Sequence, residues 1–261
     1  MIYAIIQARM GSTRLPGKVM MDLCGHPVIA HVVNRLNESN FIDKIIIATS
    51  LDSNNQPIID FCKETNIDYF VGSEDDVLDR YYQTAINNKI NDDDIIIRIT
   101  SDCPLIDPFV VDKVIEEHIS NKNDYTTNVI ECTYPDGLDC EVFNFNVLKE
   151  AWINANLSSQ REHVTLYIRD NPDKFKLGNV KNNKDLSSLR WTLDEKEDFI
   201  FINEVYNNLF NTESIFTMDD VVQLLKKKPE LLDINSKFTR NEGLMKSLNE
   251  DTDLGSRNVD E

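Results

Sequence analysis

Residues 2–18 of the chain read IYAIIQARMGSTRLPGK, and this stretch decides the fold. It opens with an apolar run, IYAII, which is typical of a buried parallel strand. A polar loop follows that holds two glycines and three cations, and the first acid appears only at Asp22, although the whole chain has a formal charge of −18. A cationic, glycine-bearing loop after a strand predicts a binding site for a polyanion.

Further along the chain, apolar runs alternate with helical patterns. The runs cover residues 44–49, 69–71 and 94–100, and the helical patterns cover about 26–38, 56–66, 77–89 and 108–121. Strands that alternate with helices of this length predict an α/β fold with a three-layer, mainly parallel sheet.

After about residue 124 the pattern loosens and predicts a mixed second half. We expect short strands near 125–130, 139–145, 175–180 and 189–193, and helices near 146–156, 160–171, 195–210 and 218–228. From about residue 236 the chain is polar, lacks periodicity and ends in acids, so we expect a poorly packed tail or an oligomer contact there.

Composition narrows the class of protein. No apolar run approaches the 18 residues of a membrane span, and we expect no signal peptide. The five cysteines form no CxxC pair and no Cys/His metal spacing, which favours reduced thiols in a cytoplasmic protein. With 27 basic against 45 acidic residues, a nucleic-acid partner is not expected.

The opening loop does not match two common nucleotide motifs. Gly11 and Gly17 are separated by five residues, and Val19 follows the lysine, so the P-loop spacing and its Mg²⁺-binding hydroxyl are both missing. The dinucleotide fingerprint G-x-G-x-x-G is also absent.

What remains, A-R-x-G-S-x-R-L-P-G-K, resembles the cytidylyltransferases that activate sugars and sugar acids. The resemblance is greatest to the spore-coat polysaccharide biosynthesis protein F family, followed by the 3-deoxy-manno-octulosonate and acylneuraminate cytidylyltransferases, and it spans roughly residues 2–235. It implies the nucleotide-diphospho-sugar transferase (Rossmann-like) fold. It also implies Mg²⁺-dependent transfer of CMP from CTP to a sugar, sugar acid or related acceptor, with release of pyrophosphate, for surface polysaccharide or glycan biosynthesis.

The same resemblance implies one nucleotidyltransferase domain over residues 1–235. Its nucleotide-binding half covers 1–123 and its acceptor-binding half covers 124–235, followed by the acidic tail 236–261. The expected partners are CTP and a small-molecule acceptor, with a homodimer possible and no membrane partner.

In the resembling family the opening loop lies over the triphosphate, so the resemblance implies nucleotide contacts by Ala8, Arg9, Gly11, Ser12, Arg14 and Lys18. Fixed cations there stabilise the charge that develops on departing pyrophosphate. A second segment, SEDDVLDRYY at residues 73–82, resembles the family's E-D-D-V-L-x-R-Y and implies that Ser73, Asp79 or Arg80 lies near the base or ribose. The alternative, that Asp79 and Arg80 are solvated helix charges, stays open.

Two aspartates are candidate Mg²⁺ ligands. Asp102 follows the predicted strand 94–100, which places it at the ligand edge of an open α/β sheet, and DCPLIDP resembles a family segment in which glycine replaces Ser101. In LRWTLDEKEDF, which resembles the family's R-W-T-x-D-x-x-x-D, Asp194 is the implied second ligand. Asp198 either assists it or is an exposed helix acid. Arg9, Arg14, Lys18 and Asp102 form the expected catalytic set.

The second half supplies the expected acceptor site. TYPDGLDCEVF resembles the family's P-x-G-L-D-x-E-V-F and assigns Gly137, Asp139 and Glu141 to it, and R-E-H-V-T adds Arg161, Glu162 and His163. The paired carboxylates either bind hydroxyls or an amine, or serve as a base. Sugar acids and phosphates are equally compatible, through Arg161 or Arg190.

Base identity rests on resemblance alone. The alternatives are a nucleotidyltransferase that uses another NTP or a phosphorylated non-sugar acceptor, and a non-catalytic nucleotide-binding module.

Overall fold

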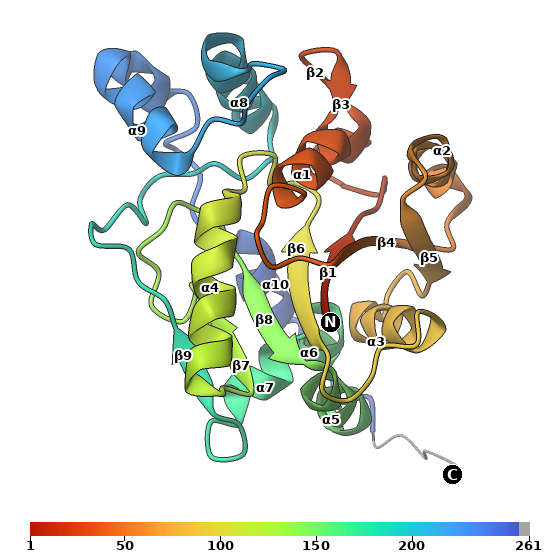
Figure 1. Ribbon diagram of the computed structural model, residues 1–261. Helices are drawn as coiled ribbons and strands as arrows, with labels where there is room; N and C mark the ends of the chain where they lie inside the picture. Colours follow the sequence, from red (N-terminus) through yellow and green to blue (C-terminus); the bar gives the residue numbers. More distant parts are fainter. Residues whose placement is uncertain (256–261) are drawn as a thin grey trace.

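Figure 1 shows the computed structural model of the chain, which describes residues 1–255; the end of the predicted tail, 256–261, lies outside the described residues. Its centre is a sheet with the strand order β5-β4-β1-β6-β8-β7-β9. In chain order these strands are β1 (Ile2–Gln7), β4 (Lys44–Ser50), β5 (Asp68–Gly72), β6 (Ile95–Thr100), β7 (Tyr125–Thr127), β8 (Glu141–Asn144) and β9 (Leu177–Asn179).

The quoted apolar run forms the middle of this sheet. β1 pairs in parallel with β4 on one side and with β6 on the other, and β5 continues the parallel order beyond β4. β8 runs antiparallel to both β6 and β7, and β9 is parallel to β7. The prediction of a mainly parallel α/β sheet with a mixed second half is therefore confirmed.

Helices cover both faces of the sheet because successive residues of β1 point to opposite sides. Ala4 and Ile6 pack in one apolar cluster with α1, α2 and α4, and Tyr3 and Ile5 pack in another with α3, α5 and α7. These helices are α1 (Val28–Leu36), α2 (Gln56–Thr65), α3 (Val77–Asn87), α4 (Pro108–Asn121), α5 (Phe145–Asn154) and α7 (Leu166–Asp170). As expected for a capping aspartate, Asp107 accepts hydrogen bonds from the amides at the start of α4.

A third apolar cluster joins the second half of the chain to α1 and α4. It packs Trp191 and Tyr134 against α8 and α9, and Leu105 joins it from the segment before α4. The remaining elements are α6 (Ser158–Glu162), α8 (Lys196–Leu209), α9 (Met218–Lys227), α10 (Glu242–Asn249), the short strands β2 (Asp22–Leu23) and β3 (His26–Pro27), and the 3-10 turns Lys18–Met20, Ser53–Asn55 and Pro229–Asp233. Within residues 1–255, each helix is too short or too polar to cross a membrane.

Two second-half predictions were wrong in detail. The helix expected over 160–171 is split into α6 and α7, because Val164 between them adopts a left-handed φ of 58°. The strand expected over 189–193 forms only an isolated bridge between Asp136 and Arg190, because the neighbouring backbone is already used by other contacts.

Over the part that the structure describes, the tail is poorly packed as expected, since α10 has no buried residue, but its place against the cavity was not expected. Residues 236–255 include α10, and several of them line the main cavity instead of trailing from the domain. Polar contacts hold them there: Arg240 donates to Asp139, and Ser158 and Ser159 donate to Asp251. Such contacts leave no hydrophobic periodicity, so they could not be predicted from sequence.

Gly137 provides a test of how the second half is packed. Its φ is 104°, and a Cβ built on it would lie 2.6 Å from the backbone nitrogen of Thr192 and 2.6 Å from the carbonyl carbon of Trp191. We expect Gly137→Ala to lower the free energy of unfolding by about 2–4 kcal/mol, measured by urea denaturation. Gly243→Ala is the control, because nothing lies within 4 Å of the added methyl. Equal unfolding midpoints for both variants would contradict this packing.

Candidate active site

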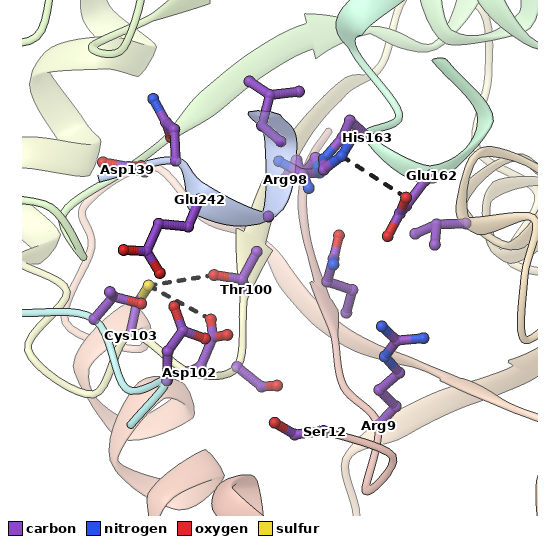
Figure 2. Close-up of a pocket in the computed structure, with 18 of the residues that line it drawn as sticks. Arg9, Ser12, Arg98, Thr100, Asp102, Cys103, Asp139, Glu162, His163 and Glu242 are labelled. Carbon is purple, nitrogen blue, oxygen red and sulfur yellow. Dashed lines mark hydrogen bonds and ion pairs between the residues drawn. The ribbon is translucent and has the colours of Figure 1, made fainter. Parts of the chain in front are cut away.

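The carboxyl ends of β1 and β6 open into a cavity of about 690 Å³ (Figure 2). Ligand pockets of α/β sheets lie at this edge and have this size. The cavity brings together thirteen of the residues that the sequence singled out: Ala8, Arg9, Gly11, Ser12, Arg14, Lys18, Arg80, Asp102, Asp139, Glu141, Glu162, His163 and Asp194.

Backbone hydrogen bonds shape the basic loop that follows β1. The carbonyl of Met10 accepts from the amides of Ser12 (2.9 Å) and Gly17 (3.0 Å), and Gly17 has a left-handed φ of 71°. The buried Asn55 side chain accepts from the Met10 amide at 2.7 Å. The loop is therefore fixed from both sides and holds its cations toward the cavity.

Lys18 lies at the centre of the site. Its ammonium donates to Asp102 at 2.6 Å and to Asp194 at 2.8 Å, and the residue is only 8% exposed. Burial alone lowers the pKa of Lys18, but the attraction of Asp102 and Asp194 outweighs it and raises that pKa above its ordinary value. Lys18 is therefore charged at neutral pH.

The same two carboxylates are the candidate metal ligands. Because both reach one ammonium nitrogen, their oxygens face a common point that suits a cation. Mg²⁺ takes few carboxylates when phosphate oxygens and waters complete its shell, so Asp102 and Asp194 fit it. Residues 1–255 offer no cluster of three or more metal-binding side chains.

The arginines of the loop are more exposed than Lys18. Arg14 contacts three carboxylates: Asp194 at 3.1 Å, Glu195 at 3.2 Å and Glu242 at 3.4 Å. Arg9 contacts Glu74 at 3.3 Å. Since both guanidiniums are partly open to solvent and line the cavity, an entering anion can reach them.

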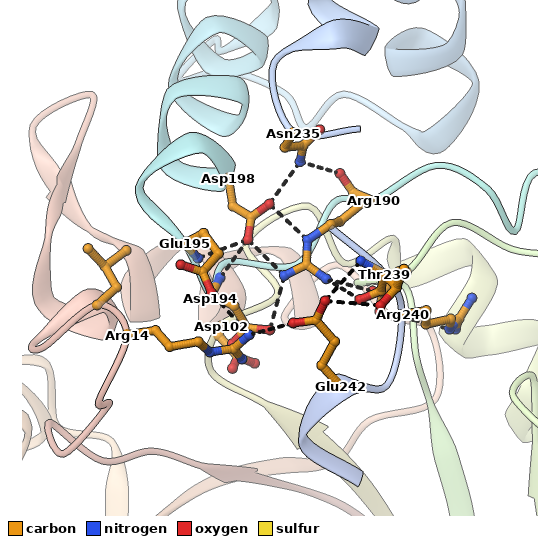
Figure 3. Close-up of polar contacts among 12 residues, drawn as sticks. Arg14, Asp102, Arg190, Asp194, Glu195, Asp198, Asn235, Thr239, Arg240 and Glu242 are labelled. Carbon is orange, nitrogen blue, oxygen red and sulfur yellow. Dashed lines mark hydrogen bonds and ion pairs between the residues drawn. The ribbon is translucent and has the colours of Figure 1, made fainter. Parts of the chain in front are cut away.

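A buried ion-pair network fixes Asp194 (Figure 3). Asp198 is fully buried and accepts from Arg190 at 2.9 Å and from the backbone amides of Asp194 (3.0 Å) and Glu195 (2.9 Å). Burial raises the pKa of Asp198, but these donors and Asn235 together hold it below its ordinary value. Asp198 is thus neither an exposed helix acid nor a residue that lines the cavity. Its carboxylate orients the backbone of Asp194.

The far end of the cavity contains a buried carboxylate with three donors. Glu141 pairs with Arg98 and accepts from Tyr125 Oη at 2.5 Å and from Thr165 Oγ1. Burial raises the pKa of Glu141, but Arg98 and the two hydroxyls outweigh burial and lower it. This carboxylate is largely engaged by the protein itself.

Asp139 is more accessible. It pairs with Arg240, and its side chain is 36% exposed. Burial of the site and the nearby charges of Asp136 and Glu141 raise the pKa of Asp139 to about 7, although Arg240 opposes the shift. Such a value suits a group that accepts a proton near neutral pH.

His163 and Glu162 lie on the wall opposite Asp102 in Figure 2. The ring nitrogen Nε2 of His163 is 3.9 Å from Glu162 and has no hydrogen-bond partner among the described residues. Burial and the positive charge of Arg98 lower the pKa of His163, so its ring is neutral at pH 7.

Four predicted residues do not line the cavity. Arg161 is bonded to Asp76 at 2.7 Å and to the Trp152 carbonyl, so its guanidinium is not turned to an acceptor. Asp79 accepts from the Trp152 indole at 2.8 Å on the outer side of α3. Ser73 bonds the α3 N-terminus, and Gly137 packs on Trp191. Each lies close to a residue that does line it.

Arg80 is buried, so the interpretation of this residue as a solvated helix charge is wrong. It is 1% exposed and donates to the carbonyl of Ser73 at 2.7 Å. No carboxylate of residues 1–255 lies within ion-pair distance of it, and its Nε has no hydrogen-bond partner there. A buried, unpaired guanidinium in the cavity wall favours a role in binding a ligand.

Several charged residues of the cavity were not predicted from sequence. Arg98 carried one usable signal, since it interrupts the apolar strand DIIIRIT. Arg169 lines the cavity with no hydrogen bond or ion pair from its guanidinium to residues 1–255, and no motif marks it. Glu242 and Lys246 come from the segment that looked like a tail.

The fold and the cavity, with a cationic loop facing two carboxylates at the edge of a parallel sheet, define a nucleotide-binding transferase. A family model described as cytidylyltransferase matches residues 3–228. The chain therefore belongs to the cytidylyltransferase family, and it is a nucleotidyltransferase.

Named relatives agree with this class. The chain is 34% identical to the spore coat polysaccharide biosynthesis protein SpsF of Bacillus subtilis over 236 residues, 88% of this chain and 95% of that protein. It is 32% identical to the 3-deoxy-manno-octulosonate cytidylyltransferase of Lawsonia intracellularis over 127 residues, 48% of each chain.

Solved structures show the same architecture. A cytidylyltransferase from Leptospira borgpetersenii superposes with a TM-score of 0.83 at 30% identity, covering 88% of this chain and 96% of that one. A CMP-2-keto-3-deoxy-manno-octonic acid synthetase complexed with CTP superposes with a TM-score of 0.60 at 17% identity, covering 80% and 99%.

The Arg98–Glu141 pair yields a prediction on pH. Glu141→Gln removes one member of a buried pair and leaves Arg98 uncompensated, so we expect a loss of about 3 kcal/mol in unfolding free energy at pH 7. The pKa of Glu141 is lower in the folded chain than in the unfolded chain, where it is about 4.3. The charge of Glu141 therefore stabilises the fold fully above about pH 4.3, and this stabilisation is lost as the pH falls through the pKa of the folded chain. The gap between variant and wild type should therefore narrow below about pH 4.

Urea denaturation from pH 3 to pH 8 measures this gap. Glu131→Gln is the control, because Glu131 forms only an exposed pair with Lys181 and its loss should leave stability unchanged at every pH. A gap that stays constant across the range would mean that the charge of Glu141 does not stabilise the fold.

Proposed function

We propose that this cytidylyltransferase transfers CMP from CTP to a sugar, sugar acid or related acceptor, with Mg²⁺ and with release of pyrophosphate. The observation that carries the proposal is the Lys18 contact with Asp102 and Asp194, which joins the cationic loop to the candidate metal ligands in one cavity. A cytoplasmic location accords with five cysteines that are all free thiols.

The loop end of the cavity fits the nucleotide. Arg9, Arg14 and Lys18 would bind the triphosphate oxygens, and the fixed backbone at Gly11 and Ser12 would approach them closely. Arg80, buried on α3 beside this loop, would reach the base or ribose. Cytosine is supported by the cytidylyltransferase family rather than by any single residue here.

The other end fits an acceptor with hydroxyl and anionic groups. Arg98 is held by Glu141, whereas Arg169 keeps its guanidinium unpaired within the described residues and would bind an acceptor carboxylate or phosphate. Asp139 would bind the acceptor hydroxyl or accept its proton. The names of two relatives, one for coat polysaccharide and one for octulosonate, point to an acceptor of the sugar class.

The proposed reaction uses the nucleotide and the acceptor bound at these two ends of the cavity. An acceptor oxygen attacks the α-phosphorus in line, the bond from that phosphorus to the pyrophosphate oxygen breaks, and no covalent enzyme intermediate forms. Asp102 and Asp194 would hold Mg²⁺, which supplies charge neutralisation on the phosphates when it is bound. Lys18 and Arg14 stabilise the growing charge of pyrophosphate, so catalysis is mainly positioning and electrostatics.

A pyrophosphate-release assay tests the proposal directly. The four NTPs are screened with Mg²⁺ and a panel of sugars, sugar acids and phosphorylated acceptors, and CTP should give release with at least one sugar-class acceptor. Asp102→Asn should lower kcat on the order of 10²-fold while the protein stays folded by circular dichroism. Asp60→Asn, an exposed change on α2, should retain the wild-type rate.

The outcomes of these assays test the choice of nucleotide, the enzymatic activity and the metal role of Asp102 separately. Release with another NTP only would overturn the assignment of CTP, and no release with any NTP and acceptor would overturn the enzymatic proposal. A wild-type rate in Asp102→Asn would remove that residue from the metal site.

Lys18→Ala tests the triphosphate contact. Loss of the ammonium leaves two facing carboxylates and should weaken CTP binding by about tenfold or more, with a much smaller effect on CMP, which lacks the outer phosphates. Isothermal titration calorimetry measures both ligands, with Lys149→Ala on the outer side of α5 as the control. Equal losses for CTP and CMP would instead indicate that Lys18 only supports packing.

A further inference from the structure

The segment from Thr239 to Asp253, the strap, contributes residues to the lining of the cavity and is anchored at both ends. At its start, Arg190 donates to the Thr239 carbonyl at 3.1 Å, and Arg240 donates to the Tyr134 carbonyl at 3.0 Å. At its end, Asp251 accepts from Ser158 and Ser159, and Asp253 forms an isolated bridge with Leu157. The segment lies beyond residue 228, where the match to the family model stops.

Between these anchors, α10 is held weakly. It contains no buried residue. Besides the contacts of Glu242, one side-chain hydrogen bond joins α10 to the rest of the described residues, from Ser247 to Glu162 at 2.6 Å. Segments with few buried contacts open at low free-energy cost. The middle of this strap, residues 241–250, can therefore lift while its anchored ends stay in place.

Glu242 connects this strap to the basic loop (Figure 3). One of its carboxylate oxygens accepts from the amide and hydroxyl of Thr239, at 3.1 and 2.9 Å, and the other contacts Arg14 at 3.4 Å. Thr239 thus orients the Glu242 carboxylate toward the guanidinium.

Arg14 has three carboxylate neighbours, of which Asp194 is also paired with Lys18 and Arg190. One guanidinium faces Glu242, Asp194 and Glu195, all within 3.4 Å. Asp194 and Glu195 are fixed by Asp198 through their backbone amides, whereas Glu242 is on the movable strap. An incoming polyanion that binds Arg14 is repelled by all three carboxylates, and of the three only Glu242 is carried by a helix without buried residues, whose backbone can withdraw.

We propose that Glu242 competes with the outer phosphates for Arg14, so that it weakens the binding of triphosphate and pyrophosphate and the strap lifts when either one binds. Glu242 then acts as a residue that sets selectivity among phosphate ligands. CMP does not extend to Arg14, so Glu242 does not change its affinity. Glu242 lowers the affinity for pyrophosphate, which is therefore released more easily after the reaction. The inference rests on the proposed role of the basic loop in binding phosphates.

The test compares Glu242→Gln with the wild-type full chain by isothermal titration calorimetry against CTP, pyrophosphate and CMP, at fixed magnesium and ionic strength. The amide keeps a carbonyl oxygen for Thr239 but removes the charge. We expect CTP and pyrophosphate to bind about 3–10-fold more tightly and CMP to bind unchanged, because an exposed ion pair of this kind is worth about one order of magnitude or less. Glu250→Gln is the control: it removes the same charge just after α10, where no side-chain contact to residues 1–255 is lost.

Hydrogen exchange measures the movement. Amides of residues 241–250 should exchange faster when pyrophosphate is added to wild type, and the difference should shrink in Glu242→Gln. Unchanged or weaker pyrophosphate binding in that variant, or slower exchange of the strap with ligand, would overturn the inference. If wild type binds pyrophosphate but not CTP, the proposed function fails while the competition at Arg14 is still measured with pyrophosphate alone.

Discussion

The contact of one ammonium with two carboxylates organises this molecule. Lys18 comes from the loop after β1, Asp102 from the turn after β6, and Asp194 from the segment before α8, so the contact fixes three distant parts of the chain at one point. Burying Lys18 without these acids, or either acid without Lys18, would be unfavourable, because unpaired charges are costly to remove from water. The elements that carry the three residues must therefore pack correctly for any one of them to be satisfied.

The second half of the chain extends this arrangement by ion pairs. Arg190 bonds Asp198, which holds the Asp194 backbone, and Arg190 also contacts the Thr239 carbonyl of the strap. A single guanidinium thus links the candidate metal ligand to the mouth of the cavity. The far end of the cavity has its own pair, Arg98 and Glu141, which joins β6 to the antiparallel strand β8. The mixed part of the sheet contributes charge to the cavity in addition to extending the core.

The parallel half of the fold could be predicted almost completely from sequence. Strands buried on both faces are apolar throughout, and their helices carry clear amphipathic spacing, so β1, β4, β6 and α4 lie within a residue or two of expectation. Most of the residues singled out from sequence line one cavity, because cations and acids next to strand ends are local features. What could not be foreseen depends on distant polar contacts. Val164 breaks a predicted helix by its left-handed backbone, and Glu242 lies in the cavity only because Arg240 and Arg190 hold the segment before it.

The order of these parts along the chain has a consequence for biosynthesis. Lys18 precedes Asp102 by 84 residues and Asp194 by 176. A ribosome releases the N-terminal half first, so β1, β4, β5 and β6 are available to pair before Asp194 has been made. Through that interval Lys18 has only Asp102 of its two carboxylate partners, and the strap does not yet exist. A chain cut short before residue 194 would keep the apolar strands of the parallel sheet but lack Asp194, Glu195 and Glu242, the three carboxylates that contact Arg14.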